Sequence, residues 1–184
     1  MTRSLSPSPL GGAPLPARAG LVQPVAAVLT DRLDDVAVAE VASRIALARR
    51  VPLLLTAVMP PHLRGSDLGP AAAPVRAVLA RVMPKIGPLH VGYIPEVFHL
   101  PAQGGSRLTA AKDLLALASR HRVPEVVASR RGPEGLDALA LIEAAALRGG
   151  PYVHAVSPAS WTSLRRPSSP SHPRCPERRP FSNE

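Results

Sequence analysis

Two polar segments carry most of the chemistry available to this chain of 184 residues, and each directly follows an apolar run. Asp31 follows the run 25–30, and the segment 130–135, Arg-Arg-Gly-Pro-Glu-Gly, follows the run 123–129. An aspartate accepts hydrogen bonds from a ribose or a base, glycines let the backbone approach a phosphate, and arginines pair with phosphate oxygens. If the fold brings the two segments together, they predict a site for a phosphorylated small molecule.

Each of these residues also has a purely structural interpretation. Asp31 stands where an acid caps the helix that follows a strand. Gly132 and Gly135 have the spacing of a turn that needs positive φ, while Arg130 and Arg131 are typical of a solvated loop. Both interpretations stay open for all five residues.

No other group of residues indicates catalysis or metal binding. The sequence has no Gly-x-Ser-x-Gly turn, and its one cysteine is Cys175. No two histidines are placed as a metal-binding pair on one helix. His90 and His99 would approach each other only across an irregular strand, and two histidines on a strand or loop surface are the simpler interpretation. We expect no catalytic residue, no metal site and no enzymatic activity.

The two ends of the chain differ in composition from its middle. Of 23 prolines, five lie in residues 1–24 and six in residues 157–184, and the formal net charge of +9 is concentrated in the same way. Sequence rich in proline, serine and arginine cannot bury enough apolar surface to offset its ordering entropy. We therefore predict a disordered extension over 1–22, a folded domain over 23–158 and a disordered tail over 159–184.

Composition also limits the partners and the compartment. The longest apolar runs are too short to span a membrane, and the early prolines interrupt any secretory leader. Few aromatic side chains accompany the arginines of the tail, so nucleic-acid binding is not expected. A single cysteine builds no disulfide framework, and we expect a cytoplasmic protein without membrane attachment.

Apolar runs alternate with segments of helical periodicity along the middle of the chain. Strands are predicted over 25–30, 53–58, 89–93, 123–129 and 152–156, with the third continuing over 97–100 after a bend at Pro95. Helices are predicted over 34–50, from Pro74 to Ile86, from Ser106 or Thr109 to about 118, and over 136–147. The apolar stripe of the first helix is expected at Val38, Val41, Ile45 and Ala48, and that of the second at Val75, Val78, Leu79, Val82 and Ile86.

This alternation predicts an α/β fold, a five-stranded parallel sheet with helices on both faces. In such folds ligands bind outside the carboxyl ends of the strands, near the point where the strand order reverses. Asp31 and the segment 130–135 both follow carboxyl ends, so the fold supports the predicted site.

The pattern resembles the universal stress protein family over residues 23–158. The resemblance rests on an apolar strand that ends in an acid at Asp31, a second strand with its terminal prolines over 53–61, and Val-Val-Ala-Ser-Arg-Arg-Gly over 126–132. The short last strand with its start Pro151-Tyr152-Val153 also fits. The resemblance implies the strand order 3-2-1-4-5, a non-catalytic regulatory role in the stress response, and a homodimer that pairs through the last strands.

Members that bind nucleotides carry Gly-x2-Gly-x9-Gly-Ser/Thr after the fourth strand. Gly132 and Gly135 match the first half, whereas Ala145 and Ala146 stand where Gly-Ser or Gly-Thr belongs, and Glu134 adds a negative charge to the loop. The resemblance implies ATP or another adenine nucleotide as ligand, held by Asp31, Arg130, Arg131, Gly132 and Gly135. Two alternatives remain: a degenerate member that binds no nucleotide and acts as a dimerising protein-interaction module, or an unrelated small α/β enzyme.

Overall fold

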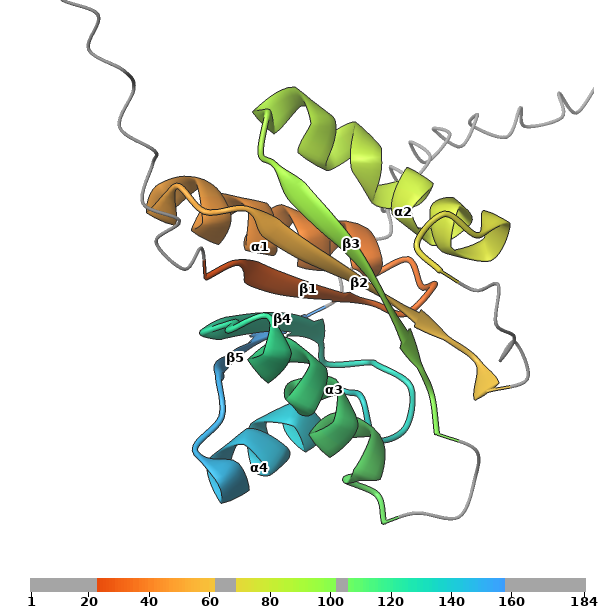
Figure 1. The fold of residues 1–184 in the computed structure, drawn as a ribbon, viewed down its shortest axis with the longest axis vertical. Helices are drawn as coiled ribbons and strands as arrows, with labels where there is room; N and C mark the ends of the chain where they lie inside the picture. Colours follow the sequence, from red (N-terminus) through yellow and green to blue (C-terminus); the bar gives the residue numbers. More distant parts are fainter. Residues whose placement is uncertain (1–22, 62–68, 102–105, 158–184) are drawn as a thin grey trace, which may run out of the picture.

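The computed structural model describes residues 23–61, 69–101 and 106–157, which form one five-stranded parallel sheet flanked by helices (Figure 1). The strands are β1 (Val25–Leu29), β2 (Leu53–Met59), β3 (Tyr93–His99), β4 (Glu125–Ser129) and β5 (Tyr152–Val156). The helices are α1 (Asp35–Arg49), α2 (Ala73–Ile86), the short 3-10 helix η2 (Gly87–Leu89), α3 (Thr109–Arg120) and α4 (Ala138–Arg148). The predicted alternation of strands and helices is confirmed.

The sheet has the order β3-β2-β1-β4-β5, which confirms the expected arrangement. Val25 at the start of β1 lies beside Leu53 of β2 on one side and Glu125 of β4 on the other. Because all pairs are parallel and start in register, the carboxyl ends of the strands lie along one edge of the sheet. The order reverses beside β1, where a ligand site is expected.

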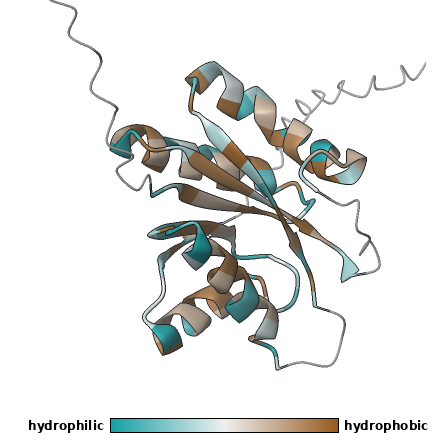
Figure 2. Ribbon diagram, viewed as in Figure 1, coloured by the Kyte–Doolittle hydropathy of each residue, from teal (hydrophilic) through white to brown (hydrophobic). Residues whose placement is uncertain are grey.

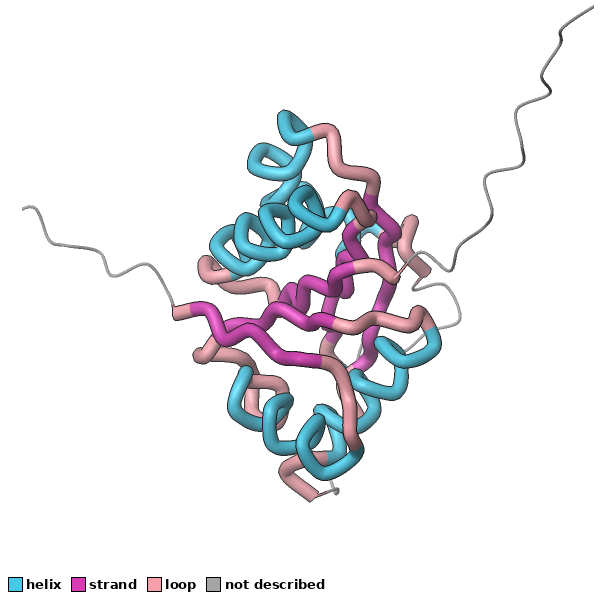
Figure 3. The backbone as a smooth tube through the Cα atoms, turned by 90° about the vertical axis from the view of Figure 1, so that its left-hand side faces the viewer, coloured by secondary structure: helices cyan, strands magenta, loops and turns pink. Residues whose placement is uncertain are grey.

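The sheet separates two apolar cores. Helices α1 and α2 pack together on one face, and α3 and α4 pack together on the other. Figure 3 shows the sheet between the two pairs of helices. Every residue of β1, β2 and β4 is buried, as strands covered on both faces require, and these strands are largely hydrophobic in Figure 2.

The predicted apolar stripe is right for α2 and right in part for α1, where Val38 is buried and Val41 and Ile45 pack against the core. All five stripe residues of α2 are buried. In α1, Ala48 is exposed, and the buried face consists of Val38 together with small residues. These small residues are Ala39, Ala42, Ser43 and Ala46. Alanines surround this helix on most sides, so the sequence does not distinguish the face that packs on the sheet.

The third strand begins later than predicted. Leu89 belongs to η2, and β3 starts at Tyr93 and passes through Pro95 without a break, with Pro95 beside Leu55 of β2. Proline has no amide hydrogen, but β3 is an edge strand, where the amide of every second residue faces away from the sheet. Helix α4 likewise begins at Ala138, after the capping residue Asp137, and not at 136.

Several predictions from the sequence concern residues outside the described ones. The extension 1–22, the tail 159–184 and Cys175 are among them. Within residues 23–61, 69–101 and 106–157, no helix is long and apolar enough to cross a bilayer.

Candidate functional site

A cavity of about 500 Å³ opens at the carboxyl edge of the sheet, where β1, β2 and β3 end. It is lined by Thr30, Asp31 and Arg32 after β1, Val58, Met59 and Pro60 around the end of β2, Pro74, Ala77, Val78 and Arg81 of α2, Leu100 after β3, and Pro133 after β4. The apolar walls come from β2 and α2, and the charged groups come from the turn after β1 and from α2. This combination of apolar walls and a few polar groups is typical of small-molecule sites.

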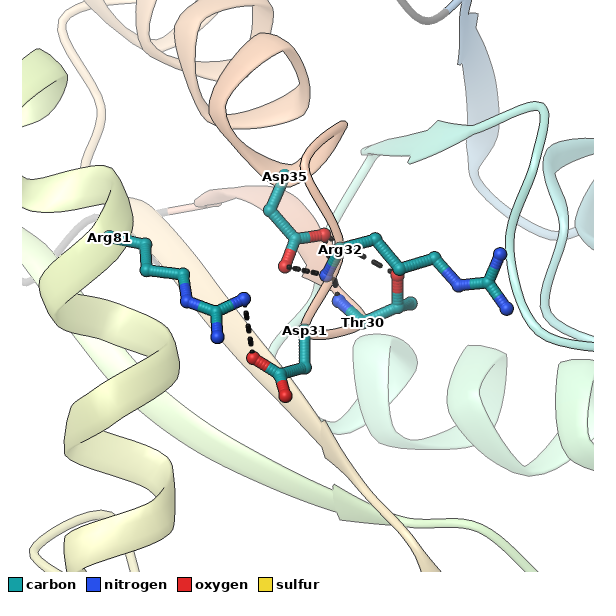
Figure 4. A network of polar contacts seen from close by, with 5 residues as sticks. All are labelled: Thr30, Asp31, Arg32, Asp35 and Arg81. Atoms are coloured by element: carbon teal, nitrogen blue, oxygen red, sulfur yellow. Dashed lines mark hydrogen bonds and ion pairs between the residues drawn. The ribbon is translucent and has the colours of Figure 1, made fainter.

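Asp31 lies in this cavity in a left-handed backbone conformation, with φ of 62°. Its Oδ1 atom is 2.7 Å from the Nη1 atom of Arg81 on α2 (Figure 4). Both side chains are about half exposed, so the ion pair remains in contact with solvent. Asp31 does not cap α1, because Asp34 occupies the capping position.

The conformation of Asp31 is held by a second aspartate, Asp35, in the first turn of α1. The side chain of Asp35 is buried and accepts hydrogen bonds from the amides on both sides of Asp31: Thr30 N at 2.9 Å and Arg32 N at 3.1 Å (Figure 4). The hydroxyl of Thr30 donates a longer bond of 3.4 Å. Burial raises the pKa of the Asp35 carboxyl, and the bonds from these amides oppose that rise.

The turn after β1 is tied to the loop after β4. The Nη1 group of Arg32 donates to the carbonyl oxygen of Arg131 at 3.1 Å. The Ser129 hydroxyl donates to Asp34 Oδ2 at 2.9 Å and accepts from the Arg131 amide at 3.0 Å. The fold therefore brings the two polar segments together, as the sequence analysis expected.

The two glycines of the loop are needed for packing. A Cβ atom on Gly132 would lie 2.6 Å from the carbonyl oxygen of Leu136 and 2.8 Å from two backbone atoms of Asp137. Gly135 has φ of 77°, and a Cβ atom there would lie 2.6 Å from the carbonyl oxygen of Arg107. Both contacts are with backbone, which cannot move away as a flexible side chain can. The expected positive φ occurs at Gly135 and not at Gly132, which is needed for close packing alone.

Arg130 and Arg131 are exposed at the start of this loop. Within the described part of the chain, neither guanidinium group makes an ion pair. Of the five residues predicted for the site, Asp31 is the one that lines the cavity, and the loop contributes Pro133. Ligand binding by the five residues stays a prediction.

Sequence reasoning missed three charged residues of the site, Arg32, Arg81 and Asp35. Arg81 lies on the exposed side of α2, far from Asp31 in sequence, and no spacing connects the two. Asp35 stands near the start of the predicted helix 34–50, where an acid suits the helix dipole. An acid in a first helical turn is common, and nothing in the sequence shows that this one is buried.

The histidines form no second site among the described residues. His90 precedes β3 and His99 ends it, so the whole length of a strand separates them, and the simpler interpretation as strand or loop histidines is confirmed. His121 pairs instead with Glu96, with 2.8 Å between Nε2 and Oε2. No group of three metal-binding side chains occurs within residues 23–61, 69–101 and 106–157.

The fold and the cavity define a class, the doubly wound α/β domains with a ligand cavity at the reversal point of the sheet. Comparison with solved structures narrows the fold to that of universal stress proteins. One protein of that family from Burkholderia pseudomallei matches with a TM-score of 0.52 and 14% identity, covering 74% of this chain and 97% of its own. No protein-family model and no curated protein sequence matches the chain.

Two further matches are complexes with nucleotides. A universal stress protein in complex with cAMP has a TM-score of 0.50 and 15% identity, covering 74% of this chain and 97% of its own. The universal stress protein from Archaeoglobus fulgidus in complex with dAMP has a TM-score of 0.51 and 18% identity, covering 73% of this chain and 98% of its own. At such identities the likeness establishes the fold, which agrees with the resemblance found in the sequence.

Proposed function

We propose that this chain is a regulatory domain of the universal stress protein type that binds an adenine nucleotide in the carboxyl-edge cavity and catalyses no reaction. The observation that carries the proposal is the position of the cavity, which lies at the reversal point of the sheet with Asp31 in its wall. Proteins of this fold have been solved with cAMP and with dAMP. The apolar walls suit a base, and a carboxylate suits the hydroxyl or amino donors of a nucleoside.

Asp31 is the residue we expect to contact the nucleoside. Arg81 engages its Oδ1 atom, and within the described residues Oδ2 has no hydrogen-bond partner. Half of the side chain is exposed, so a ligand can reach the free oxygen. Arg81 also offsets the negative charge that Asp31 would otherwise bring beside a nucleotide.

The surroundings of Ser129 support a regulatory role. Its hydroxyl is buried, donates to Asp34 and accepts from the Arg131 amide, so it is not placed to attack a substrate. Among the residues that the structure describes, no histidine lines the cavity. We infer a cytoplasmic protein that responds to stress by binding a nucleotide and passing the change to a partner.

Calorimetry on the full chain tests the proposal. We expect heat on titration with AMP, and we expect Asp31→Asn to weaken AMP binding about tenfold to a hundredfold, because a hydrogen bond to a charged group contributes ~1.5–3 kcal/mol. Asparagine tolerates the left-handed conformation, so the turn is preserved. Asp113→Asn, on the exposed face of α3, is the matched control and should bind AMP normally.

Two results would overturn the proposal in different ways. No heat with AMP or ATP up to millimolar concentrations, with or without magnesium, removes nucleotide binding altogether. Normal affinity in Asp31→Asn would leave the binding but remove Asp31 from the site.

A specific surface favours a second candidate function, that of a dimerising interaction module. Edge strand β5 exposes 67% of Tyr152, and the neighbouring outer face of α4 exposes three large apolar side chains. These are Leu139, Ile142 and Leu147. Exposed apolar side chains beside an open strand edge are typical of a protein interface, so we propose a homodimer that pairs through β5.

Sedimentation velocity distinguishes the dimer from a monomer. We expect a dimer at tens of micromolar, and we expect Tyr152→Arg to shift it to monomer. Tyr93→Arg is the matched control, because Tyr93 is an exposed tyrosine on the opposite edge strand, β3. A monomeric wild type, or equal effects of the two substitutions, would contradict a dimer through β5. A dimer that binds no nucleotide would favour the interaction module.

A further inference from the structure

A second groove, of about 360 Å³, lies at the amino edge of the sheet, opposite the edge with the candidate site. Its walls are mostly apolar and come from the end of α1, with Leu47, and from the segments that lead into β2 and β3, with Val51 and Val91. Two basic side chains, Arg50 and His90, complete it. This amino-edge groove therefore combines an apolar floor with positive charge.

The two basic residues of the groove stand where the backbone favours glycine. Arg50 follows α1 with φ of 56°, and His90 follows η2 with φ of 51°. Glycine and asparagine adopt this left-handed conformation more readily than long side chains do. The helix dipole favours a cation anywhere in the last turn, as with Arg49, and so does not require one at these two positions. A cation kept against the backbone preference indicates a use for its charge.

The charges at the groove are free to bind a partner. Within the described part of the chain, Arg50, His90 and Lys85, which lies in the last turn of α2, are exposed and make no ion pair. Helices α1 and α2 pack against each other, so their basic ends lie on the same side of the sheet. These groups give the groove an attraction for carboxylates.

The rest of the amino edge has the same sign of charge. The other two helices on this edge end in exposed cations without ion pairs among the described residues, namely Arg120, Arg122 and Arg148. In the four connections from helix to strand, 49–53, 85–93, 119–125 and 147–152, the one carboxylate is that of Glu125, which pairs with Arg49. No acidic group of these connections is left to neutralise the edge, so an anionic partner is favoured over its whole length.

We propose that the amino-edge groove docks an acidic segment of a partner protein, with an apolar side chain of that segment in the groove and its carboxylates against Arg50 and Lys85. The apolar walls favour such a segment over a nucleic acid, because no Phe, Tyr or Trp is among the described residues that line the groove and could stack on a base. Leu47 exposes 43% of its surface there and Leu89 exposes 37% beside it, which suits an apolar anchor. The inference names a class of partner and rests on the proposed function for the regulatory role alone.

The test is fluorescence anisotropy on the full chain with a labelled synthetic peptide of glutamates and aspartates around two central leucines. We expect binding that weakens as salt is raised, because exposed charges are screened. Arg50→Gly should weaken binding about fivefold without lowering the urea midpoint, because glycine suits the left-handed backbone. Arg76→Ala, which removes an exposed cation from α2 outside the groove, is the matched control and should bind the peptide normally.

A second pair of variants tests the apolar part of the groove. Gly92 lines it, and a Cβ atom there meets nothing within 4 Å, so a leucine can enter. Gly92→Leu should weaken peptide binding about tenfold by taking the place of the anchor. Gly69→Leu is the matched control, because Gly69 has the same open surroundings outside the groove.

Four results would each overturn the inference: no binding of the peptide, equal binding of a peptide with serines in place of the leucines, normal binding by Arg50→Gly, or tighter binding of a thymidine oligonucleotide than of the peptide. If circular dichroism shows that Arg50→Gly is unfolded, Arg50→Asn takes its place with the same expectations. The peptide is titrated without nucleotide. Failure of peptide binding therefore leaves the nucleotide site standing, and failure of AMP binding leaves the docking groove standing.

Discussion

Asp35 is the residue whose loss should most directly disturb the turn that carries Asp31. In Asp35→Ala the amides of Thr30 and Arg32 both lose their acceptor. Thr30 is partly buried, so its orphaned amide costs ~1–3 kcal/mol, whereas the exposed Arg32 exchanges its bond for one to water. Release of the buried charge offsets part of this loss. We expect a net destabilisation of ~1–2 kcal/mol, equivalent to a fall in Tm of ~3–8 °C for a domain of this size.

The pH dependence of stability gives a sharper test of the same residue. Burial raises the pKa of Asp35 in the folded state. A raised pKa means that the folded protein binds this proton more tightly than the unfolded chain, so the contribution of Asp35 to stability is full below the unfolded pKa and is lost as pH rises through the folded pKa. Asp35→Asn cannot ionise. The free energy of unfolding of the wild type should therefore increase relative to that of Asp35→Asn as pH falls from 7 towards the ordinary aspartate range.

Urea unfolding followed by circular dichroism at pH 7 and pH 5 measures both effects. Thr30→Val is the matched control, because it removes the 3.4 Å bond to Asp35 and leaves the two amide bonds. It should change the free energy of unfolding by less than ~1 kcal/mol. Two results would refute the reasoning: an unchanged urea midpoint in Asp35→Ala, or a free energy of unfolding of the wild type that decreases relative to that of Asp35→Asn on acidification.

Two further predictions concern packing. Gly132→Ala should lower the free energy of unfolding by more than ~2 kcal/mol, because its Cβ atom would lie 2.6 Å from a carbonyl oxygen, while Gly92→Ala, which meets nothing within 4 Å, should cost less than ~1 kcal/mol. Similar urea midpoints for the two variants would contradict the packing role of Gly132. Leu114→Ala and Val82→Ala lie in the cores on opposite faces of the sheet, so we expect their effects on the free energy of unfolding to add within ~0.5 kcal/mol. Strong coupling in the double variant would show that the sheet does not separate the cores.

The architecture could be predicted because its signals are local. Apolar runs of strand length alternate with helical segments, and a parallel sheet follows from that order. The face of α2 could also be predicted, because large aliphatic side chains mark it against charged neighbours. The face of α1 could be predicted only in part, because Ala39, Ala42 and Ala46 are buried there while Ala48 is exposed, and alanine gives little contrast.

The path of β3 shows how position in the sheet overrides a local signal. Pro95 indicates an interruption when it is considered alone. On an edge strand its missing amide hydrogen removes no bond if the nitrogen faces outward, so the strand continues. The sequence around Pro95 does not reveal that the strand is at an edge.

The candidate site was predictable where it follows from topology. Asp31 and the loop after β4 come directly after strands that turn out to be adjacent, and their proximity follows from the parallel sheet. The partner of Asp31 was not predictable, since Arg81 is far from it in sequence. The two side chains meet only because α2 and the turn after β1 line the same cavity. The buried state of Asp35 depends on the same tertiary arrangement.

The packing of Gly132 and Gly135 has a consequence for the two halves of the nucleotide-binding motif. Both glycines are required so that the loop after β4 can close against Leu136, Asp137 and Arg107. A chain that has stopped binding phosphates would therefore still be selected to keep them, simply in order to fold. The Gly-Ser/Thr half is under no such constraint here, where alanines occupy its place on α4. The first half is thus a marker of the fold, and the second half carries the information about the ligand.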